Sequence, residues 1–291
     1  MDIITTENLT KFYGSERGIE GVSINVKQGD IFGFIGPNGA GKSTTIRTLL
    51  NLIFPSSGSS QIFGKDTVTE SSEIKKKVGY LPSEVNYYDN MSVQDLLNFS
   101  ATFFPNTDNK YRKELCERFA LDTNREVNEL SLGNRKKVAI VQALMHRPEL
   151  LIMDEPTSGL DPLMQTEFHE VLKKANKDGT TLFFSSHILG DVQKICNRVS
   201  IIRNGVIEAN EDIESLLARQ LKKVSLVLND DAKEEQFAKE EISKLNLLHQ
   251  RVSFTYSESP NELLRFIAQL EVKDLTIEEP TLEDIFMHYY E

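Results

Sequence analysis

The sequence predicts an α/β domain with a mainly parallel sheet over residues 1–211, followed by a small α+β domain over residues 212–291. In the first part, short apolar runs typical of buried strands alternate with helical segments. A glycine-rich segment, GPNGAGKST, joins one of these runs to a helix. In the second part, short alternating strands such as VSLVL (224–228) and VSFTY (252–256) are interleaved with helices.

Two strands are expected before the glycine-rich segment. VSINV (22–26) alternates apolar and polar residues as a half-buried strand does, and IFGFI (31–35) is typical of a fully buried one. After GPNGAGKST, apolar residues recur at i, i+3, i+4 and i+7, which indicates one face of a helix: Ile46, Leu49, Leu50 and Ile53. The glycine-rich segment is therefore predicted to connect a strand to a helix.

The middle of the chain, about residues 85–148, is predicted to be a helical subdomain. Ser92 begins a capping-box pattern, a second helix is expected over residues 111–119, and a third begins after Ser131 and ends before Pro148. No sustained heptad pattern occurs in this region, so a long coiled coil is not expected.

Strands return after the helical subdomain. LLIM (150–153) is a short apolar run that ends directly before Asp154, and Asp161 with Pro162 marks the start of another helix. TLFFSS is the next expected strand, and VSIIR-NG-VIEA (199–209) is a hairpin whose Asn-Gly pair suits a type I′ turn. The chain ends PTLEDIFMHYYE, where a capped amphipathic helix is expected to close the second domain.

The composition is that of an ordinary globular protein, with 39% apolar and 26% charged residues. No run approaches the roughly 20 apolar residues of a membrane-spanning helix, and MDIITTENLTKFYG lacks the features of a signal peptide. We therefore expect any association with a membrane to go through a partner. Cys116, Cys196 and the five histidines show no metal-ligand or redox spacing.

The formal net charge is −11, and most of it lies in the second domain. From Asp212 onward there are nine Lys and Arg residues against seventeen Asp and Glu residues. This balance repels phosphate backbones and anionic lipid, so nucleic acid and a bare membrane surface are not expected as partners.

Gly36, Gly41, Lys42 and Ser43 satisfy the P-loop pattern G-x-x-x-x-G-K-[ST]. Glycines at these positions let backbone N–H groups surround phosphate oxygens at a helix N-terminus, where the aligned peptide dipoles favour negative charge. Lys42 is predicted to reach the β- and γ-phosphates, and the Ser43 hydroxyl is predicted to bind Mg²⁺. The pattern indicates an NTPase with a phosphate-binding loop.

Asp154 and Glu155 follow a buried strand, at the edge where a parallel sheet exposes its ligands. Asp154 suits direct or water-mediated coordination of Mg²⁺. Glu155 is predicted to be the general base that orients the attacking water. Taken alone, such a pair also caps helices, but beside a P-loop the catalytic interpretation is favoured.

Seven segments in order make the pattern more specific: KFYG, GPNGAGKST, YLPSE, LSLGN, LLIMDEP, SGLD and SSH. Over about residues 1–211 the chain resembles the ABC transporter ATPase family. The resemblance implies a P-loop NTPase fold of the ABC type with a helical subdomain, and an ATP hydrolase that uses Mg²⁺. It implies that Tyr13 stacks on adenine and that His187 contacts the γ-phosphate. The ATP-binding set it implies in the same subunit is Tyr13, Gly36, Pro37, Asn38, Gly39, Ala40, Gly41, Lys42, Ser43 and Thr44.

The resemblance also implies a dimer. Ser131 and Gly133 begin a helix and form a second anion site. In the family two subunits bind head to tail with two ATP molecules between them, so that Ser131, Gly133 and Asp161 would act on the nucleotide held by the other subunit. Symmetry requires both sites on every subunit. The second ATPase subunit is expected to be an identical chain, with a related chain left open.

Two departures from the family pattern bear on the site. Leu132 and Asn134 stand where the family has a second glycine and a glutamine, while Ser131 and Gly133 remain. Ser83 stands where the family has a glutamine that touches Mg²⁺. Serine keeps an oxygen ligand on a shorter side chain, so Ser83 is a further candidate for Mg²⁺, through water or with help from Glu84.

Other P-loop proteins fit the sequence less well. GTPases and kinases lack LSLGN and SGLD, and NKDG (176–179) is not the guanine-reading N-K-x-D motif. DNA-repair ATPases of this type insert a long coiled coil, and translation-associated ones usually carry two cassettes. The end of the chain is similar to ATPase subunits of bacterial drug, antibiotic and peptide exporters. The prediction is therefore an exporter ATPase, peripheral on the cytoplasmic face of the membrane and attached through a separate transmembrane permease. A non-transport or importer ATPase is the alternative.

Overall fold

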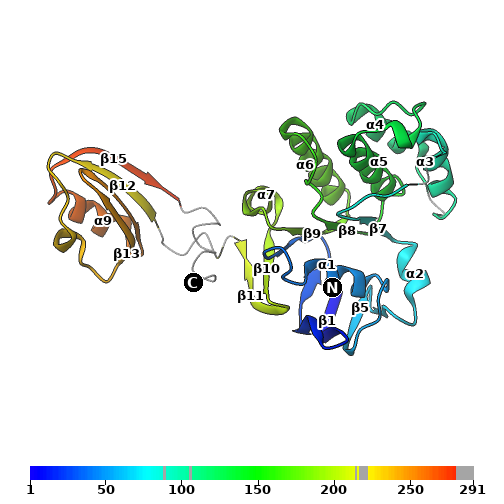
Figure 1. Cartoon of the computed structure of the whole chain (residues 1–291), viewed down its shortest axis with the longest axis horizontal. Coiled ribbons are helices and arrows are strands. Elements are labelled where there is room, and N and C mark those ends of the chain that lie inside the picture. The colour runs from blue at the N-terminus through cyan, green and yellow to red at the C-terminus, as the bar shows by residue number, and fades with distance from the viewer. Residues whose placement is uncertain (88–89, 105–106, 214, 216–221, 280–291) are drawn as a thin grey trace. The chain divides into compact units, whose positions relative to one another are not determined.

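The computed structural model falls into two compact units, Met1–Asn210 and Glu211–Glu291. Each unit is described by itself, and Figure 1 shows the elements of both. The structure describes residues 1–87, 90–104, 107–213, 215 and 222–279. None of the helices in this described part is long and apolar enough to cross a membrane.

The first unit contains an antiparallel sheet with strand order β2-β1-β5-β6, and β3 also pairs with β1. Its strands are β1 (Asp2–Tyr13), β2 (Glu16–Val22), β3 (Asn25–Lys27), β5 (Ser57–Ile62) and β6 (Lys65–Asp66).

The prediction of one strand over residues 22–26 is wrong, because the chain breaks between β2 and β3. Thr6 occupies this break. Its hydroxyl donates to the carbonyl of Val22 at 2.9 Å and accepts from the N–H of Ile24 at 2.9 Å. In a continuous strand the Val22 carbonyl and the Ile24 N–H would form hydrogen bonds with the backbone of a neighbouring strand. Here the Thr6 side chain takes that place.

The second sheet of this unit has the strand order β11-β10-β4-β9-β8-β7. Its strands are β4 (Ile31–Ile35), β7 (Val78–Leu81), β8 (Leu150–Asp154), β9 (Thr181–Ser186), β10 (Arg198–Arg203) and β11 (Val206–Asp212). The pairs from β10 through β7 are parallel, as the alternation of strands and helices predicts. Asn204 and Gly205 have φ values of 49° and 80°, so the Asn-Gly turn before β11 has the backbone that a type I′ turn requires.

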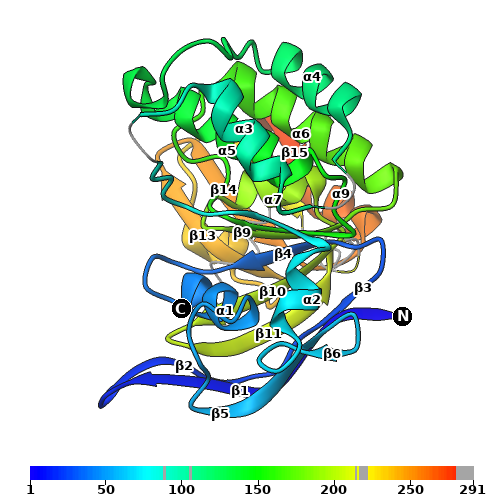
Figure 2. The ribbon, with the colours of Figure 1, turned by 90° about the vertical axis from the view of Figure 1, so that its right-hand side faces the viewer.

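Helices cover both faces of the parallel sheet, as Figures 1 and 2 show. Helix α1 (Lys42–Leu49) lies between the two sheets, and α2 (Ser71–Lys75) precedes β7. On the other face, α5 (Leu132–Leu144) packs on β7, α6 (Pro162–Lys177) on β9, and α7 (Leu189–Ile195) on β9 and β4. The apolar core between the sheets draws on β1, β2, β4, α1 and β8–β10.

The helical subdomain consists of α3 (Val93–Ala101), α4 (Asn109–Arg118), the short 3₁₀ helix η1 (Val127–Glu129) and α5. Each of its three α-helices has a side-chain N-cap, from Ser92, Asp108 and Ser131. Helix α4 begins two residues before the predicted start because the Asp108 carboxylate accepts hydrogen bonds from the next two free N–H groups.

The second unit is a small antiparallel sheet with a helix, and its strand order is β13-β14-β12-β15. Its elements are β12 (Lys222–Leu228), η2 (Glu234–Phe237), β13 (Ile242–Leu248), β14 (Arg251–Tyr256), α9 (Pro260–Ile267) and β15 (Val272–Glu278). Phe237, Phe254 and Phe266 meet in its core. The predicted α+β character is confirmed for these residues, and the helix predicted in PTLEDIFMHYYE lies outside the described ones.

Candidate functional site

The glycine-rich segment runs from the end of β4 to the start of α1, as predicted. A methyl group at Gly36 would lie 2.3 Å from the carbonyl oxygen of Ile202, and one at Gly41 would lie 2.7 Å from Cγ2 of Ile19. Gly41 also has a φ of 108°, which disfavours any residue with a Cβ. Only glycine fits at these two positions, so the loop can wrap closely and present its N–H groups at the helix start.

Lys42 is the first residue of α1, and its side chain is 6% exposed. The Nζ atom donates to the carbonyl oxygens of Gly36 at 2.6 Å and Pro37 at 3.2 Å. It also forms an ion pair with Oε1 of Glu155 at 3.1 Å. The structure therefore brings the predicted phosphate-binding lysine and the predicted general base into direct contact.

Glu155 follows the last residue of β8 and has a left-handed backbone, with a φ of 47°. A non-glycine residue in this conformation costs on the order of 1–3 kcal/mol, and such residues concentrate at functional sites. The Glu155 N–H donates to the carbonyl of Ser185 at 3.2 Å, which fixes the peptide on its N-terminal side. The strained backbone turns the side chain away from the strand and toward Lys42.

His187 completes this cluster, with its Nδ1 atom 2.8 Å from Oε2 of Glu155. An ionised carboxylate can only accept hydrogen bonds, so Nδ1 carries the hydrogen when Glu155 is charged. The other ring nitrogen, Nε2, is then free to face a ligand from a half-exposed ring. The two predicted catalytic residues, Glu155 and His187, are thus held together with Lys42.

Asp154 ends β8 and is only 1% exposed. Its carboxylate accepts a hydrogen bond of 2.7 Å from the Ser185 hydroxyl. The hydroxyl of Ser43, the second residue of α1, makes no hydrogen bond to any residue that the structure describes. Carboxylate and hydroxyl oxygens are the ligands that Mg²⁺ prefers, so Asp154 and Ser43 fit the ion together with phosphate oxygens. Within the described ranges no three His, Cys, Asp or Glu residues gather as a metal site by themselves.

The position of Ser83, in the segment after β7, is held through its backbone. Its carbonyl oxygen accepts a hydrogen bond of 3.2 Å from Nζ of Lys136. The structure records no hydrogen bond of the Ser83 hydroxyl to another described residue. The side chain thus has an oxygen to offer, and its role toward Mg²⁺ stays a prediction.

Tyr13 is the last residue of β1, and its ring is 47% exposed. A methyl group at Gly18 would lie 2.9 Å from Cε2 of Tyr13 and 3.1 Å from Cγ2 of Thr44. The Tyr13 ring and the Thr44 side chain at the start of α1 therefore both lie against Gly18. An exposed aromatic face beside a P-loop suits stacking on a nucleobase.

Ser131, Gly133 and Asp161 lie at the starts of two other helices. The Ser131 hydroxyl caps α5 by accepting from the N–H of Asn134 at 3.4 Å, and Asp161 caps α6 by accepting from Met164 at 3.0 Å. A methyl group at Gly133 would lie 3.1 Å from the carbonyl of Gly159, so LSLGN and SGLD are neighbours. No contact recorded among the described residues joins these helix starts to the P-loop.

Sequence reasoning missed three polar residues that shape the site. The Thr157 hydroxyl donates to the buried Asp191 carboxylate at 2.8 Å, which ties the segment after Glu155 to α7. Lys136 is 3% exposed and donates to three backbone carbonyls. Burial lowers the pKa of Lys136 to about 8, and the nearby Asp154 and Glu155 oppose this shift. The signal for Lys136 was its place on the apolar stripe of α5, four residues before Ile140.

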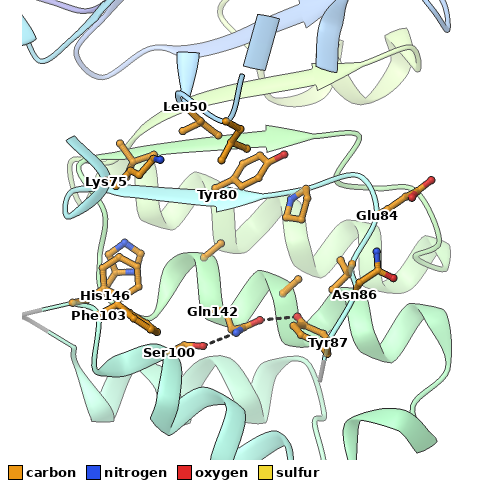
Figure 3. Close-up of a pocket in the computed structure, with 17 residues that line it drawn as sticks. Leu50, Lys75, Tyr80, Glu84, Asn86, Tyr87, Ser100, Phe103, Gln142 and His146 are labelled. Atoms are coloured by element: carbon orange, nitrogen blue, oxygen red, sulfur yellow. Dashed lines mark hydrogen bonds between the residues drawn. The ribbon is translucent and has the colours of Figure 1, made fainter. Parts of the chain in front are cut away.

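A cleft of about 630 Å³ lies between the parallel sheet and the helical subdomain. Figure 3 shows residues from α2, β7, α3 and α5 around it, together with Leu50, which follows the end of α1. Tyr87 donates to the side chain of Gln142 at 2.6 Å, and Gln142 donates to the Ser100 hydroxyl at 2.6 Å. His146 stacks on Phe104 at this cleft. Burial lowers the pKa of His146 to about 4, an effect that the backbone of neighbouring residues only partly offsets.

Comparison with known proteins decides the family. Residues 19–158 match the ABC transporter family, and residues 210–290 match the family described as ATP-binding protein DrrA1-3-like, C-terminal domain. The chain is 35% identical to the bacitracin transport ATP-binding protein BcrA of Bacillus licheniformis, with 98% of this chain and 96% of that protein covered. The chain belongs to the ABC transporter ATP-binding proteins.

Other relatives of this ABC ATPase agree. It is 35% identical to the linearmycin resistance ATP-binding protein LnrL of Bacillus subtilis, over 70% of this chain and 67% of that protein. An ATP-binding subunit of an ABC transporter matches with a TM-score of 0.69 and 27% identity, over 74% of this chain and 91% of the other. A dimeric post-hydrolysis state of the cassette MJ0796, bound to ADP and Pi, matches with a TM-score of 0.66 and 25% identity, over 72% of this chain and 98% of the other.

These findings confirm the predicted family, fold class and enzymatic activity. The ABC ATPase binds ATP with Mg²⁺ and hydrolyses it as a transport ATPase. The roles assigned to single residues remain predictions that the geometry supports.

Proposed function

We propose that this ABC ATPase powers the export of a drug, antibiotic or peptide through a separate membrane permease. The observation that carries the proposal is the likeness over nearly the whole chain to a bacitracin transport ATP-binding protein. A second relative is named for resistance to linearmycin. The match to a DrrA-like C-terminal domain adds support from the second unit, for which we propose an accessory or regulatory role.

The proposed chemistry starts at the cluster of Lys42, Glu155 and His187. The γ-phosphate competes with Glu155 for Lys42, and the freed carboxylate orients a water and accepts its proton. Because the Nδ1 atom of His187 lies 2.8 Å from Oε2 of Glu155, the ring orients that carboxylate, and its Nε2 faces the phosphate. Mg²⁺ held by Ser43 and Asp154 would neutralise charge on the β- and γ-phosphates.

The proposed working unit is a dimer, identical or of two related chains. Ser131 and Gly133 lie at the exposed start of α5, where the hydroxyl and the first N–H groups form an anion site. A second copy that brings this site to the γ-phosphate would close both pockets at once. ATP then favours the closed dimer in proportion to the contacts it gains there, and hydrolysis removes them.

The permease is proposed to contact the cleft between the parallel sheet and the helical subdomain. Leu52 and Phe103 line the cleft and are more than half exposed, which is unusual for large apolar side chains beside a concave surface. Helix α1 carries Lys42 at its start, and Leu50, directly after its end, lines the cleft. A permease segment in the cleft would thus reach the nucleotide site through one rigid helix. The attachment to the permease is proposed to be on the cytoplasmic face of the membrane.

The alternatives have no observation in their favour. The relatives described above are named for antibiotic transport or resistance, and an importer or a non-transport ATPase is not among them. We retain the exporter assignment as the proposal to test.

Replacing Glu155 with Gln tests the catalytic part of the proposal. We expect ATP turnover to fall about 10²- to 10⁴-fold, a barrier increase of roughly 3–5 kcal/mol, because the amide cannot accept the proton. ATP binding and an ATP-dependent dimer, measured by equilibrium binding and light scattering, should persist. Glu149→Gln is the matched control, since Glu149 lies before the opposite end of β8 in a surface ion pair. Normal turnover in Glu155→Gln would remove Glu155 from the mechanism.

The transport part is tested by purifying the tagged ATPase from solubilised membranes. A permease should co-elute with the wild type and with Glu155→Gln, but Phe103→Asp should reduce its recovery while leaving the ATPase activity of the isolated subunit unchanged. A strain lacking the ATPase should become more sensitive to peptide antibiotics, and Glu155→Gln should not restore resistance. Recovery of only ribosomal or other soluble proteins would contradict the exporter assignment.

A further inference from the structure

Lys136 connects three parts of the candidate site. It lies on α5, five residues after Ser131, and its side chain is buried. Its Nζ atom donates to the carbonyl oxygens of Pro82 at 2.8 Å, Ser83 at 3.2 Å and Glu155 at 3.3 Å. The first two carbonyls follow β7, and the third follows β8, so one ammonium group bridges two segments at the carboxyl edge of the sheet.

Burying a lysine at this position is unfavourable in free energy. The group is surrounded by backbone carbonyls and forms no ion pair with any carboxylate that the structure describes. Removing an ammonium ion from water costs several kcal/mol, and carbonyl dipoles return only part of it. Ala139, Ile140 and Ala143 share the buried face of α5, where an apolar residue such as Met would pack without this cost. Packing alone therefore does not account for a lysine here.

The contact with Glu155 gives the lysine a specific effect. The backbone of Glu155 is left-handed, a conformation that relaxes unless the surroundings fix it. Its N–H is held by the carbonyl of Ser185, and its C=O is held by Lys136 and by the N–H of Ser158, both at 3.3 Å. These hydrogen bonds fix the peptides on both sides of Glu155, and among them the bond from Lys136 is the one made by a side chain of α5. The fixed backbone directs the carboxylate toward Lys42 and His187.

We infer that Lys136 is a positioning residue for ATP hydrolysis, which holds the backbone of Glu155 in its reactive conformation and links it to residues 82–83 and to the start of α5. The inference rests on the proposed role of Glu155 as the general base. Because α5 also carries Ser131, a shift of this helix or of the segment after β7 reaches Glu155 through the same ammonium group.

Lys136→Met is the direct test, with Lys137→Met as the matched control on the same helix. Turnover per folded molecule should fall about 10- to 100-fold in Lys136→Met, while the dissociation constant for ATP stays within about twofold. The melting temperature should stay equal or rise, because a buried charge is removed. A purely structural role would instead lower the melting temperature and leave turnover per folded molecule unchanged. Lys136→Gln, a shorter amide donor, serves if the Met variant does not fold.

A double-mutant cycle separates this inference from the proposed function. If Lys136 acts through Glu155, adding Lys136→Met to Glu155→Gln should lower turnover by less than about twofold further. Multiplicative losses would show that Lys136 acts independently of Glu155 and would overturn the inference. Normal turnover in Glu155→Gln alone would instead refute the role of Glu155, which is a distinct outcome. Unchanged turnover in folded Lys136→Met also overturns the inference.

Discussion

The two units of this ABC ATPase differ in what they bury. Every polar or charged residue recorded as buried among the described residues belongs to the first unit, including Lys42, Lys136, His146, Asp154 and Asp191. The core of the second unit is built from aliphatic side chains, three phenylalanines and Tyr256, and none of its residues carries a charge. Burying these polar groups lowers the folding stability of the first unit, but it holds them where nucleotide chemistry needs them. The core of the second unit carries no such cost.

This difference predicts opposite responses to substitution. Core residues of the second unit should affect the stability of that unit without changing ATP turnover. Buried polar residues of the first unit should act through the charges and hydrogen bonds that they hold. Substitutions at Phe254, His146 and Thr157 test this contrast, from the largest expected effect to the smallest.

Phe254→Ala should destabilise the second unit by about 3–5 kcal/mol, because it leaves a cavity between Phe237 and Phe266. Thermal unfolding monitored by calorimetry should show a lower transition for this unit, with the transition of the first unit unchanged. Leu264→Ala on the exposed side of α9 is the control and should shift neither transition. A loss of basal ATPase activity in folded Phe254→Ala would break the contrast between the units.

His146 should make the first unit less stable in acid. Its pKa of about 4 in the folded state lies below the ordinary value of 6.5, so the unfolded chain binds more protons between these two pH values. Stability is therefore complete above pH 6.5 and falls by about 3 kcal/mol as the pH drops toward 4. His146→Phe keeps the ring that stacks on Phe104 and should remove this component. Denaturant unfolding of both proteins across this range is the measurement, and parallel curves would contradict the prediction.

Thr157→Val should cost about 1–3 kcal/mol of stability, because it leaves the buried Asp191 carboxylate without its hydroxyl donor. Thr157→Ser keeps the hydroxyl and should stay within about 1 kcal/mol of the wild type. Equilibrium unfolding in urea measures both. Equal destabilisation by Val and Ser would show that the methyl group, and not the hydrogen bond, matters at this position.

Much of the fold, and the positions of the candidate site residues, could be predicted from local patterns. The P-loop glycines, the strand before Asp154 and the Asn-Gly turn each follow from a short segment whose conformation its own residues dictate. Parallel strands end at one edge, and at this edge the structure brings Lys42 and Glu155 together in an ion pair.

What the sequence did not reveal depends on contacts between distant segments. The break between β2 and β3 exists because the Thr6 hydroxyl reaches across from β1. Lys136 looks like any helical lysine until the segments after β7 and β8 are placed around it. Likewise, nothing in the local sequence pairs Thr157 with Asp191, which lie 34 positions apart. Such pairings are set by tertiary packing, which no local period encodes.

The turn between β10 and β11 has a consequence for protein engineering. The N–H of Gly205 donates to the carbonyl of Ala40 in the P-loop at 2.9 Å, and its own carbonyl accepts from the N–H of Glu20 on β2 at 2.8 Å. A methyl group at Gly205 would lie 3.0 Å from the carbonyl of Gly18. Three segments far apart in the sequence therefore meet through backbone contacts. Chimaeras of related ATPases should exchange residues near 18–20, 40 and 205 as a set. A crossover that separates them would combine segments from two proteins at a contact that leaves no room for a Cβ atom.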